Sequence, residues 1–184
     1  MSVLNGLVLP PGAGRRFVTP AHEVTFKVTG EHSAVGSVFE VVVPPGFDVG
    51  AHAHAHSEEV FYILEGELDL LAFEPRERTP HGWRSWQGPD GSTVVRAGPG
   101  SVAHVPPGCP HAFANPTDEP ARMLFQSAPP PAHERYFEEL LEILDGGGPP
   151  DPAAIAELRE RYDIHQITPL RTDARAPAGR PAGG

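Results

Sequence analysis

Residues 46–66 read GFDVGAHAHAHSEEVFYILEG, and this stretch places His52, His54 and His56 at every second position. Alternate residues of a β-strand point to the same side of the sheet, so three imidazoles at this spacing can converge on one point. A carboxylate follows within a few residues. Imidazole nitrogen and carboxylate oxygen are typical ligands of divalent transition metals. The stretch therefore predicts a metal site, with a solvent-facing histidine stripe as the plainer interpretation.

A second segment, residues 100–115, decides between these interpretations. It reads GSVAHVPPGCPHAFAN and carries His111 just after a Pro-Pro-Gly turn. Together the two segments resemble the paired signatures of the cupin superfamily. The first signature, G-x5-H-x-H-x4-E-x6-G, is matched by Gly46, His52, His54, Glu59 and Gly66. The second, G-x5-P-x-G-x2-H-x3-N, is matched by Gly100, Pro106, Gly108, His111 and Asn115.

The resemblance covers residues 46–115 and implies a mostly β fold, a jelly-roll barrel whose two sheets curve around a pocket. It also implies that one metal ion is held by His52, His54, Glu59 and His111. Such a set leaves open positions on an octahedral ion for water, substrate or oxygen. Nickel, iron, cobalt or manganese are the favoured metals, and zinc or copper would also accept these ligands.

The register of the first signature needs an argument, because a set that begins at His54 is also conceivable. The glycines of the signature exclude this shifted set. A continuous strand cannot bring His52 and Glu59 to one face, because side chains alternate and the two residues differ in parity. We therefore expect a turn near residues 56–58, which would make His56 a rim or surface residue.

Five further residues are candidates for the pocket around the metal: Phe61, Ile63, His104, Phe113 and Asn115. The first two share a strand face with Glu59, and the last two share one with His111. Plain core packing explains Phe61 and Ile63 equally well. For His104 a pocket acid or base and a surface imidazole are both compatible with the sequence, and Asn115 fits a turn better than a metal ligand.

Short apolar runs between turn-forming residues predict one barrel over residues 1–128, which includes an N-terminal arm over 1–13. The expected strands are 15–18, 23–29, 34–43, 59–66, 67–74, 92–96, 101–105, 110–115 and 121–127. Residues 44–50 are expected to form a turn. Between the two signatures, residues 75–91 form a polar insert with both tryptophans, Trp83 and Trp86. The insert is either a lid over the barrel mouth or a hairpin far from it.

Residues 129–168 are expected to form a helical extension. Apolar residues at 136, 137, 140, 141 and 144 predict one helix, and a second should begin with Asp151 as N-cap and Pro152 in the first turn. These helices must pack either on the barrel or on a second subunit. Residues 169–184 have almost no apolar content and are predicted to be a disordered tail. We also expect a homodimer formed by strand pairing.

Composition restricts the partners. The net charge of -10, from 24 acidic and 14 basic residues, argues against a surface for nucleic acid or anionic membrane. The single cysteine, Cys109, permits no intrachain disulfide. The N-terminus lacks the order of a secretory signal and no apolar run is long enough to span a membrane, so a cytoplasmic protein is expected.

Three functional hypotheses remain open, because cupins host many chemistries. The segments HSEEVFYILEGEL and PPGCPHAF resemble bacterial flavonol dioxygenases of the quercetinase type. That resemblance implies an aromatic or enolic small-molecule substrate, with Glu59 also acting as the base that takes its hydroxyl proton. The second hypothesis is a non-oxidative metalloenzyme, a polyketide cyclase or isomerase, in which His104 or Glu59 moves protons. The third is a non-catalytic metal-binding or ligand-binding domain.

Overall fold

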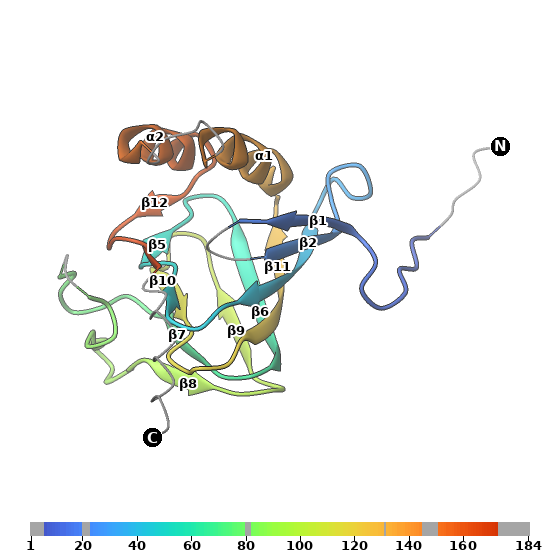
Figure 1. Cartoon of the computed structure of the whole chain (residues 1–184). Helices are drawn as coiled ribbons and strands as arrows, with labels where there is room; N and C mark the ends of the chain where they lie inside the picture. The colour runs from blue at the N-terminus through green and yellow to red at the C-terminus, as the bar shows by residue number, and fades with distance from the viewer. Residues whose placement is uncertain (1–5, 20–22, 80–81, 131, 145–150, 173–184) are drawn as a thin grey trace, which may run out of the picture.

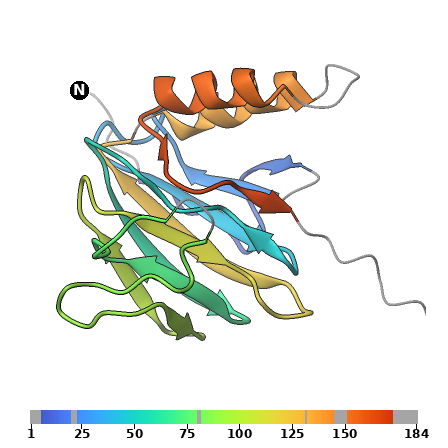
Figure 2. The ribbon, with the colours of Figure 1, turned by 90° about the vertical axis from the view of Figure 1, so that its left-hand side faces the viewer.

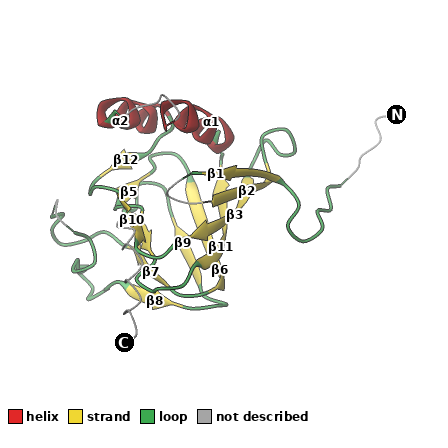
Figure 3. Cartoon of the chain, viewed as in Figure 1, coloured by secondary structure: helices red, strands yellow, loops and turns green. Residues whose placement is uncertain are grey.

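The computed structural model of the chain describes residues 6–19, 23–79, 82–130, 132–144 and 151–172. In these residues two β-sheets face each other, and two helices cover one end of the pair (Figures 1 and 3). The expected mostly β class with two C-terminal helices is confirmed.

The first sheet has the strand order β1-β2-β3-β11-β6-β9, with antiparallel neighbours throughout. Its strands are β1 (Arg15–Val18), β2 (Glu23–Val28), β3 (Ser37–Val43), β6 (Glu58–Glu65), β9 (Val102–Val105) and β11 (Ala121–Ala128). The second sheet has the order β12-β5-β10-β4-β13, and β7 pairs with both β10 and β8. Its strands are β4 (Phe47–Asp48), β5 (His52–Ala53), β7 (Leu68–Ala72), β8 (Val95–Ala97), β10 (His111–Ala114), β12 (His165–Gln166) and β13 (Arg171–Thr172).

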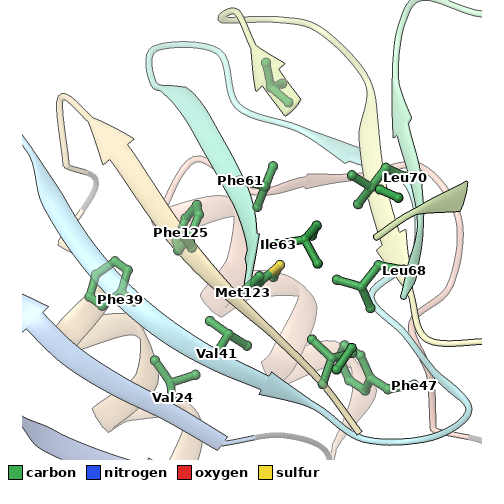
Figure 4. Packing of buried hydrophobic residues seen from close by; sticks show 14 of the residues in the cluster. Val24, Phe39, Val41, Phe47, Phe61, Ile63, Leu68, Leu70, Met123 and Phe125 are labelled. Carbon is green, nitrogen blue, oxygen red and sulfur yellow. The ribbon is translucent and has the colours of Figure 1, made fainter. Parts of the chain in front are cut away.

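The main hydrophobic core lies between the two sheets. Strand β6 alternates buried and more exposed residues, so that Glu59, Phe61 and Ile63 all face inward. Phe61 and Ile63 belong to the same apolar cluster as Met123 and Phe125 of the neighbouring β11 (Figure 4). Burial of these side chains stabilises the fold by roughly 1.5–3 kcal/mol each. The same alternation carries one carboxylate, Glu59, into an otherwise apolar interior.

Several boundaries differ from the expectation. The expected turn at 44–50 contains β4, which pairs with both β10 and β13. The strand expected at 92–96 forms only as β8, which begins at Val95. Sequence pattern alone missed β4 because a two-residue strand has no periodicity to detect.

The tryptophan insert is not a lid. Trp83 and Trp86 are buried and belong to a separate apolar cluster with Leu71, Ala112 and Ala114 of β7 and β10. The indole Nε1 of Trp83 donates a hydrogen bond of 2.8 Å to Asp48. The insert therefore covers the outer face of the second sheet, on the side away from the main core.

The C-terminal extension packs on the barrel of its own chain. Helices α1 (His133–Leu144) and α2 (Pro152–Arg161) lie across one end of the two sheets (Figure 2). Asp151 is the N-cap of α2 and accepts a hydrogen bond from the amide of Ala153, with Pro152 in the first turn as expected. The helices meet in a small apolar cluster of their own, formed by Tyr136, Leu140, Leu158 and Ile164.

After α2 the chain returns to the second sheet. Strand β12 pairs with β5, and β13 pairs with β4. The sequence predicts a disordered tail from residue 169, whereas residues 171–172 form β13. The rest of that predicted tail, 173–184, lies outside the described residues. Strand β13 can form in this segment of low apolar content because backbone hydrogen bonding to a sheet edge requires no apolar side chains.

No described helix has the length and apolar character needed to cross a membrane. The homodimer stays a prediction. In the described part of the chain β1 and β9 are the outer strands of the first sheet, where strand pairing with a second copy would occur.

Candidate metal centre

Strand pairing in the second sheet brings the two sequence signatures together. His111 on β10 lies directly opposite His52 on β5. Strand β5 ends at Ala53, His54 faces inward like His52 two residues earlier, and the chain bends after it. The side-chain nitrogens of His52, His54 and His111 lie within 4.8 Å of one another, and all three residues are buried.

Glu59 reaches this cluster from the opposite sheet. Its Oε1 lies 3.0 Å from Nε2 of His54, and its Oε2 lies 3.0 Å from Nε2 of His111. The side chain is only 2% exposed. The bend at 54–57 resolves the parity difference between His52 and Glu59, because the two residues lie on strands of different sheets. It also leaves His56 exposed at the surface.

Backbone carbonyls orient the three imidazoles. Nδ1 of His52 lies 2.9 Å from the carbonyl oxygen of Gly50, and that of His54 lies 2.7 Å from the carbonyl of Asp163. Nδ1 of His111 lies 3.1 Å from the carbonyl of Cys109. A carbonyl can only accept, so each Nδ1 carries a proton, and Nε2 is the ring nitrogen left to bind a metal. This is the arrangement in which imidazoles bind metals.

The residues present therefore fit a divalent metal. Nε2 of His111 is buried and makes no hydrogen bond of good geometry, although Glu59 is close. Burial, followed by the neighbouring imidazoles His111 and His54, lowers the pKa of His52 well below its ordinary value. Burial alone would raise the pKa of Glu59, but His54 and His111 together bring it well below its ordinary range. The cluster thus combines a neutral imidazole with an ionised carboxylate.

Asp163, between α2 and β12, links the C-terminal extension to this cluster. Its backbone has a positive φ of 59°, which places its carbonyl against His54. Its carboxylate accepts hydrogen bonds of 2.9 Å from the amides of Ala55 and His56. One residue therefore holds both a proposed ligand and the turn that follows it.

A further histidine, His133, approaches the cluster from the first turn of α1. Its Nε2 lies 4.0 Å from Oε1 of Glu59, and its ring packs edge-on against Phe39 and Phe125. Nδ1 is buried without a hydrogen-bond partner in the described part of the chain. Burial is the main cause that lowers the pKa of His133 to about 4. The sequence gives no signal that His133 lies beside the cluster, because it is far from both signatures along the chain.

The cluster lies at the wall of a cavity of about 110 Å³, between the barrel and the helices. Most of its lining is apolar: Val24, Val41, Phe47, Val49, Phe61, Phe113, Met123, Phe125, Tyr136, Phe137, Leu140, Ile164 and Leu170. The polar groups on the cavity wall are His52, His54, Glu59, His133, Arg159 and Gln166. The C-terminal extension therefore supplies a large part of the cavity wall.

Of the five pocket candidates, two line the cavity and three do not. Phe61 and Phe113 line the cavity. Ile63 is fully buried in the core but does not reach the cavity. His104 lies on the outer face of the first sheet, where its Nε2 is 3.5 Å from the exposed Glu58. Asn115 is buried in a turn and donates hydrogen bonds to the carbonyls of residues 43 and 119.

His104 could not be placed from the sequence because strand alternation defines two faces without saying which one is inside. The pairing of β9 with β6 decides this: His104 lies opposite Val60, whereas Val105 lies opposite the inward-facing Glu59.

Comparison with known proteins identifies the family of the chain. The model of the cupin family matches residues 12–140, which is most of the chain, and the chain belongs to this family. It is 31% identical over 102 residues to the uncharacterized protein MJ1618 of Methanocaldococcus jannaschii, covering 53% of this chain. The chain spans 64% of the length of that relative.

Solved structures of the same architecture include the polyketide cyclase RemF of Streptomyces resistomycificus. It superposes with a TM-score of 0.52 at 18% identity, over 67% of this chain and 80% of RemF. A double-stranded β-helix protein of Klebsiella pneumoniae superposes with a TM-score of 0.49 at 16% identity, over 68% and 91% of the two chains. At this identity the likeness to RemF establishes the shared jelly-roll fold and no activity.

Proposed function

We propose that this cupin is a metal-dependent dioxygenase that acts on a small aromatic or enolic molecule. The observation that carries the proposal is the cluster of His52, His54, Glu59 and His111, in which the first three residues line an apolar cavity. Nickel, iron, cobalt or manganese are the expected metals, with zinc or copper as further possibilities.

The reaction needs few groups from the protein. A bound metal supplies Lewis acidity and a template that orients the reactants. Glu59 is an ionised carboxylate at the cavity wall and would take the proton of a substrate hydroxyl, leaving an electron-rich anion. Dioxygen is the oxidant, and both of its atoms end in the product, so no separate reductant is required. The apolar wall formed by residues such as Phe61, Phe113 and Phe125 excludes water from that anion.

The size of the cavity restricts the substrate. A volume of about 110 Å³ is of the same order as the roughly 150 Å³ cavity that admits a benzene molecule. It therefore suits a molecule with a single ring better than a flavonol, whose three rings would require α1 and α2 to move outward. This volume moves the preferred substrate away from flavonols and does not bear on the reaction class.

Oxygen consumption tests the proposal directly. Metal-free protein would be loaded in turn with iron, nickel, cobalt, manganese or zinc and mixed with a panel of single-ring phenols and small enols. We expect uptake of one dioxygen per substrate consumed, with at least one redox-active metal, and no uptake by the His111→Ala variant. The absence of uptake with every metal, in protein that binds one equivalent of it, would reject the dioxygenase.

A non-oxidative cupin enzyme is the second candidate, and His133 is the observation that favours it. An isomerase or cyclase needs a group that carries a proton to and from its substrate. His104 cannot serve, because it lies on the outer surface. His133 can, because it lines the cavity and its Nδ1 has no hydrogen-bond partner among the described residues. Turnover of substrate without oxygen and with zinc, abolished in His133→Phe, would establish this candidate instead.

A further inference from the structure

Arg159 is a cavity residue that the proposed reaction does not use. It lies in the last turn of α2, is 9% exposed and contributes to the cavity wall. One nitrogen of its guanidinium, Nη1, donates to Oε1 of Gln166. Its Nε is buried without any hydrogen-bond partner in the described residues.

The guanidinium also has no anionic partner among the described residues, where none of the ion pairs includes it. Its neighbour in the same helical turn provides a contrast, because Arg161 is exposed and pairs with Glu139 at 2.8 Å. Arg159 thus combines deep burial with an unneutralised charge, whereas Arg161 combines exposure with a partner.

Gln166 holds Arg159 in place but does not neutralise it. The side-chain amide of Gln166 donates to the carbonyls of Val49 and Thr168 at 3.2 and 2.6 Å. These bonds direct its neutral oxygen toward Arg159. Strand pairing sets Gln166 opposite His52, so the arginine is anchored beside the strand that carries a proposed metal ligand.

A buried charge without a counter-charge is costly, and proteins retain one where an ion completes the pair. The fork of N–H donors in arginine matches the two oxygens of a carboxylate. The cavity has room for an apolar group of roughly one ring. Apart from Arg159, the polar groups of its wall are those of the metal centre, His133 and Gln166.

We infer that the cavity takes a small carboxylic acid with an apolar body of about one ring, and that Arg159 binds its carboxylate. The inference rests on the proposed function for one end of the substrate, the end whose hydroxyl oxygen would face the metal centre. The acid-binding end rests only on Arg159 and the cavity.

Calorimetric titration tests the acid-binding end without any turnover. The probes are benzoate, phenylacetate and cyclohexanecarboxylate, each compared with its own amide, on protein loaded with zinc and on metal-free protein. Each pair has nearly the same shape and differs in charge. We expect at least one acid to bind about 10-fold to 100-fold more tightly than its amide, as one charge-assisted pair provides.

Two variants locate the effect. Arg159→Gln keeps the length and polarity of the side chain and should reduce the preference for the acid to about one. Arg161→Gln removes an equal charge from the same turn and should leave the preference unchanged, so it controls for the general electrostatic field. Equal binding of acid and amide by the wild-type protein would overturn the inference without reference to any variant.

The same inference would be overturned if Arg159→Gln, folded by circular dichroism, kept the preference, or if no acid bound at millimolar concentration. Its failure is distinguishable from that of the proposed function. Preferential binding of acids without oxygen uptake would reject the dioxygenase and support the acid site. Oxygen uptake with neutral substrates, and no preference for acids, would support the dioxygenase and reject the acid site.

Discussion

Asp163 offers the sharpest test of how the C-terminal extension supports the metal centre. Its carboxylate accepts two backbone hydrogen bonds of 2.9 Å, and its own backbone is in the left-handed region with φ of 59°. Because the two amides belong to exposed residues, each bond is worth about 1 kcal/mol, which is below the roughly 1.5–3 kcal/mol of a hydrogen bond to a charged group. The left-handed conformation costs a residue with a Cβ atom about 1–2 kcal/mol, except that Asn and Gly tolerate it.

A graded series of substitutions follows from these values. Asp163→Asn keeps one acceptor and the backbone preference, and should lower the free energy of unfolding by about 1 kcal/mol. Asp163→Gly removes both bonds and should cost about 2 kcal/mol. Asp163→Ala adds the backbone strain and should cost about 3 kcal/mol. Urea unfolding of the metal-free protein, followed by circular dichroism, measures all three.

Metal affinity provides the second half of this test. The carbonyl of Asp163 fixes the ring of His54, and disturbance of such a partner typically costs 10-fold to 100-fold in metal affinity. Competition with a chromogenic chelator for zinc should show this loss in Asp163→Ala. Glu160→Gln, which alters only an exposed contact with His165, is the control and should change neither property. Equal stability across the series, or lower stability with unchanged zinc affinity, would refute the reasoning.

Three further predictions concern the ligands, the insert and pH. His111→Ala should lose its metal, measured by elemental analysis, while circular dichroism shows an intact fold; His56→Ala should retain a full equivalent, and the opposite pattern would contradict the proposed ligand set. Trp83→Ala should lower the free energy of unfolding by about 3–5 kcal/mol in urea, with unchanged zinc affinity, since Trp83 lies outside the cavity. Burial raises the pKa of Asp163, but two backbone N–H groups outweigh it and lower that pKa. Its stabilisation is therefore present at neutral pH and lost as pH falls through the lowered pKa, so in urea titrations the stability difference between wild type and Asp163→Asn should begin to shrink near pH ~4, the ordinary pKa of an aspartate, and vanish only below the lowered pKa.

The barrel was predictable because its signals are local. Alternation in β6 follows from the sequence around Glu59, and the same period places Phe61 and Ile63 on its face. The turn beyond His54 follows from the parity difference between His52 and Glu59. The Pro-Pro-Gly turn before His111 is likewise a property of a few neighbouring residues.

The contents of the cavity were less predictable. Phe61 and Ile63 share one strand face, yet only Phe61 reaches the cavity, because depth along the barrel separates them. His104 obeys the same alternation but lies on the outer face. A period of two distinguishes the faces of a strand and says nothing about which face is covered or how deep a residue lies.

The sequence by itself therefore determined the mostly β architecture, its family and the histidine and glutamate residues proposed to bind metal. The architecture follows from short-range periodicity and turn residues, and the family and the proposed ligands follow from the resemblance of two short signatures, each of which occupies a few neighbouring positions of the chain. Only the tertiary structure decided that α1 and α2 close the cavity, that His133 and Arg159 enter it, and that the two tryptophans cover the opposite face. Those outcomes depend on how distant segments dock, and docking follows from the shape and burial of whole surfaces that no local pattern encodes.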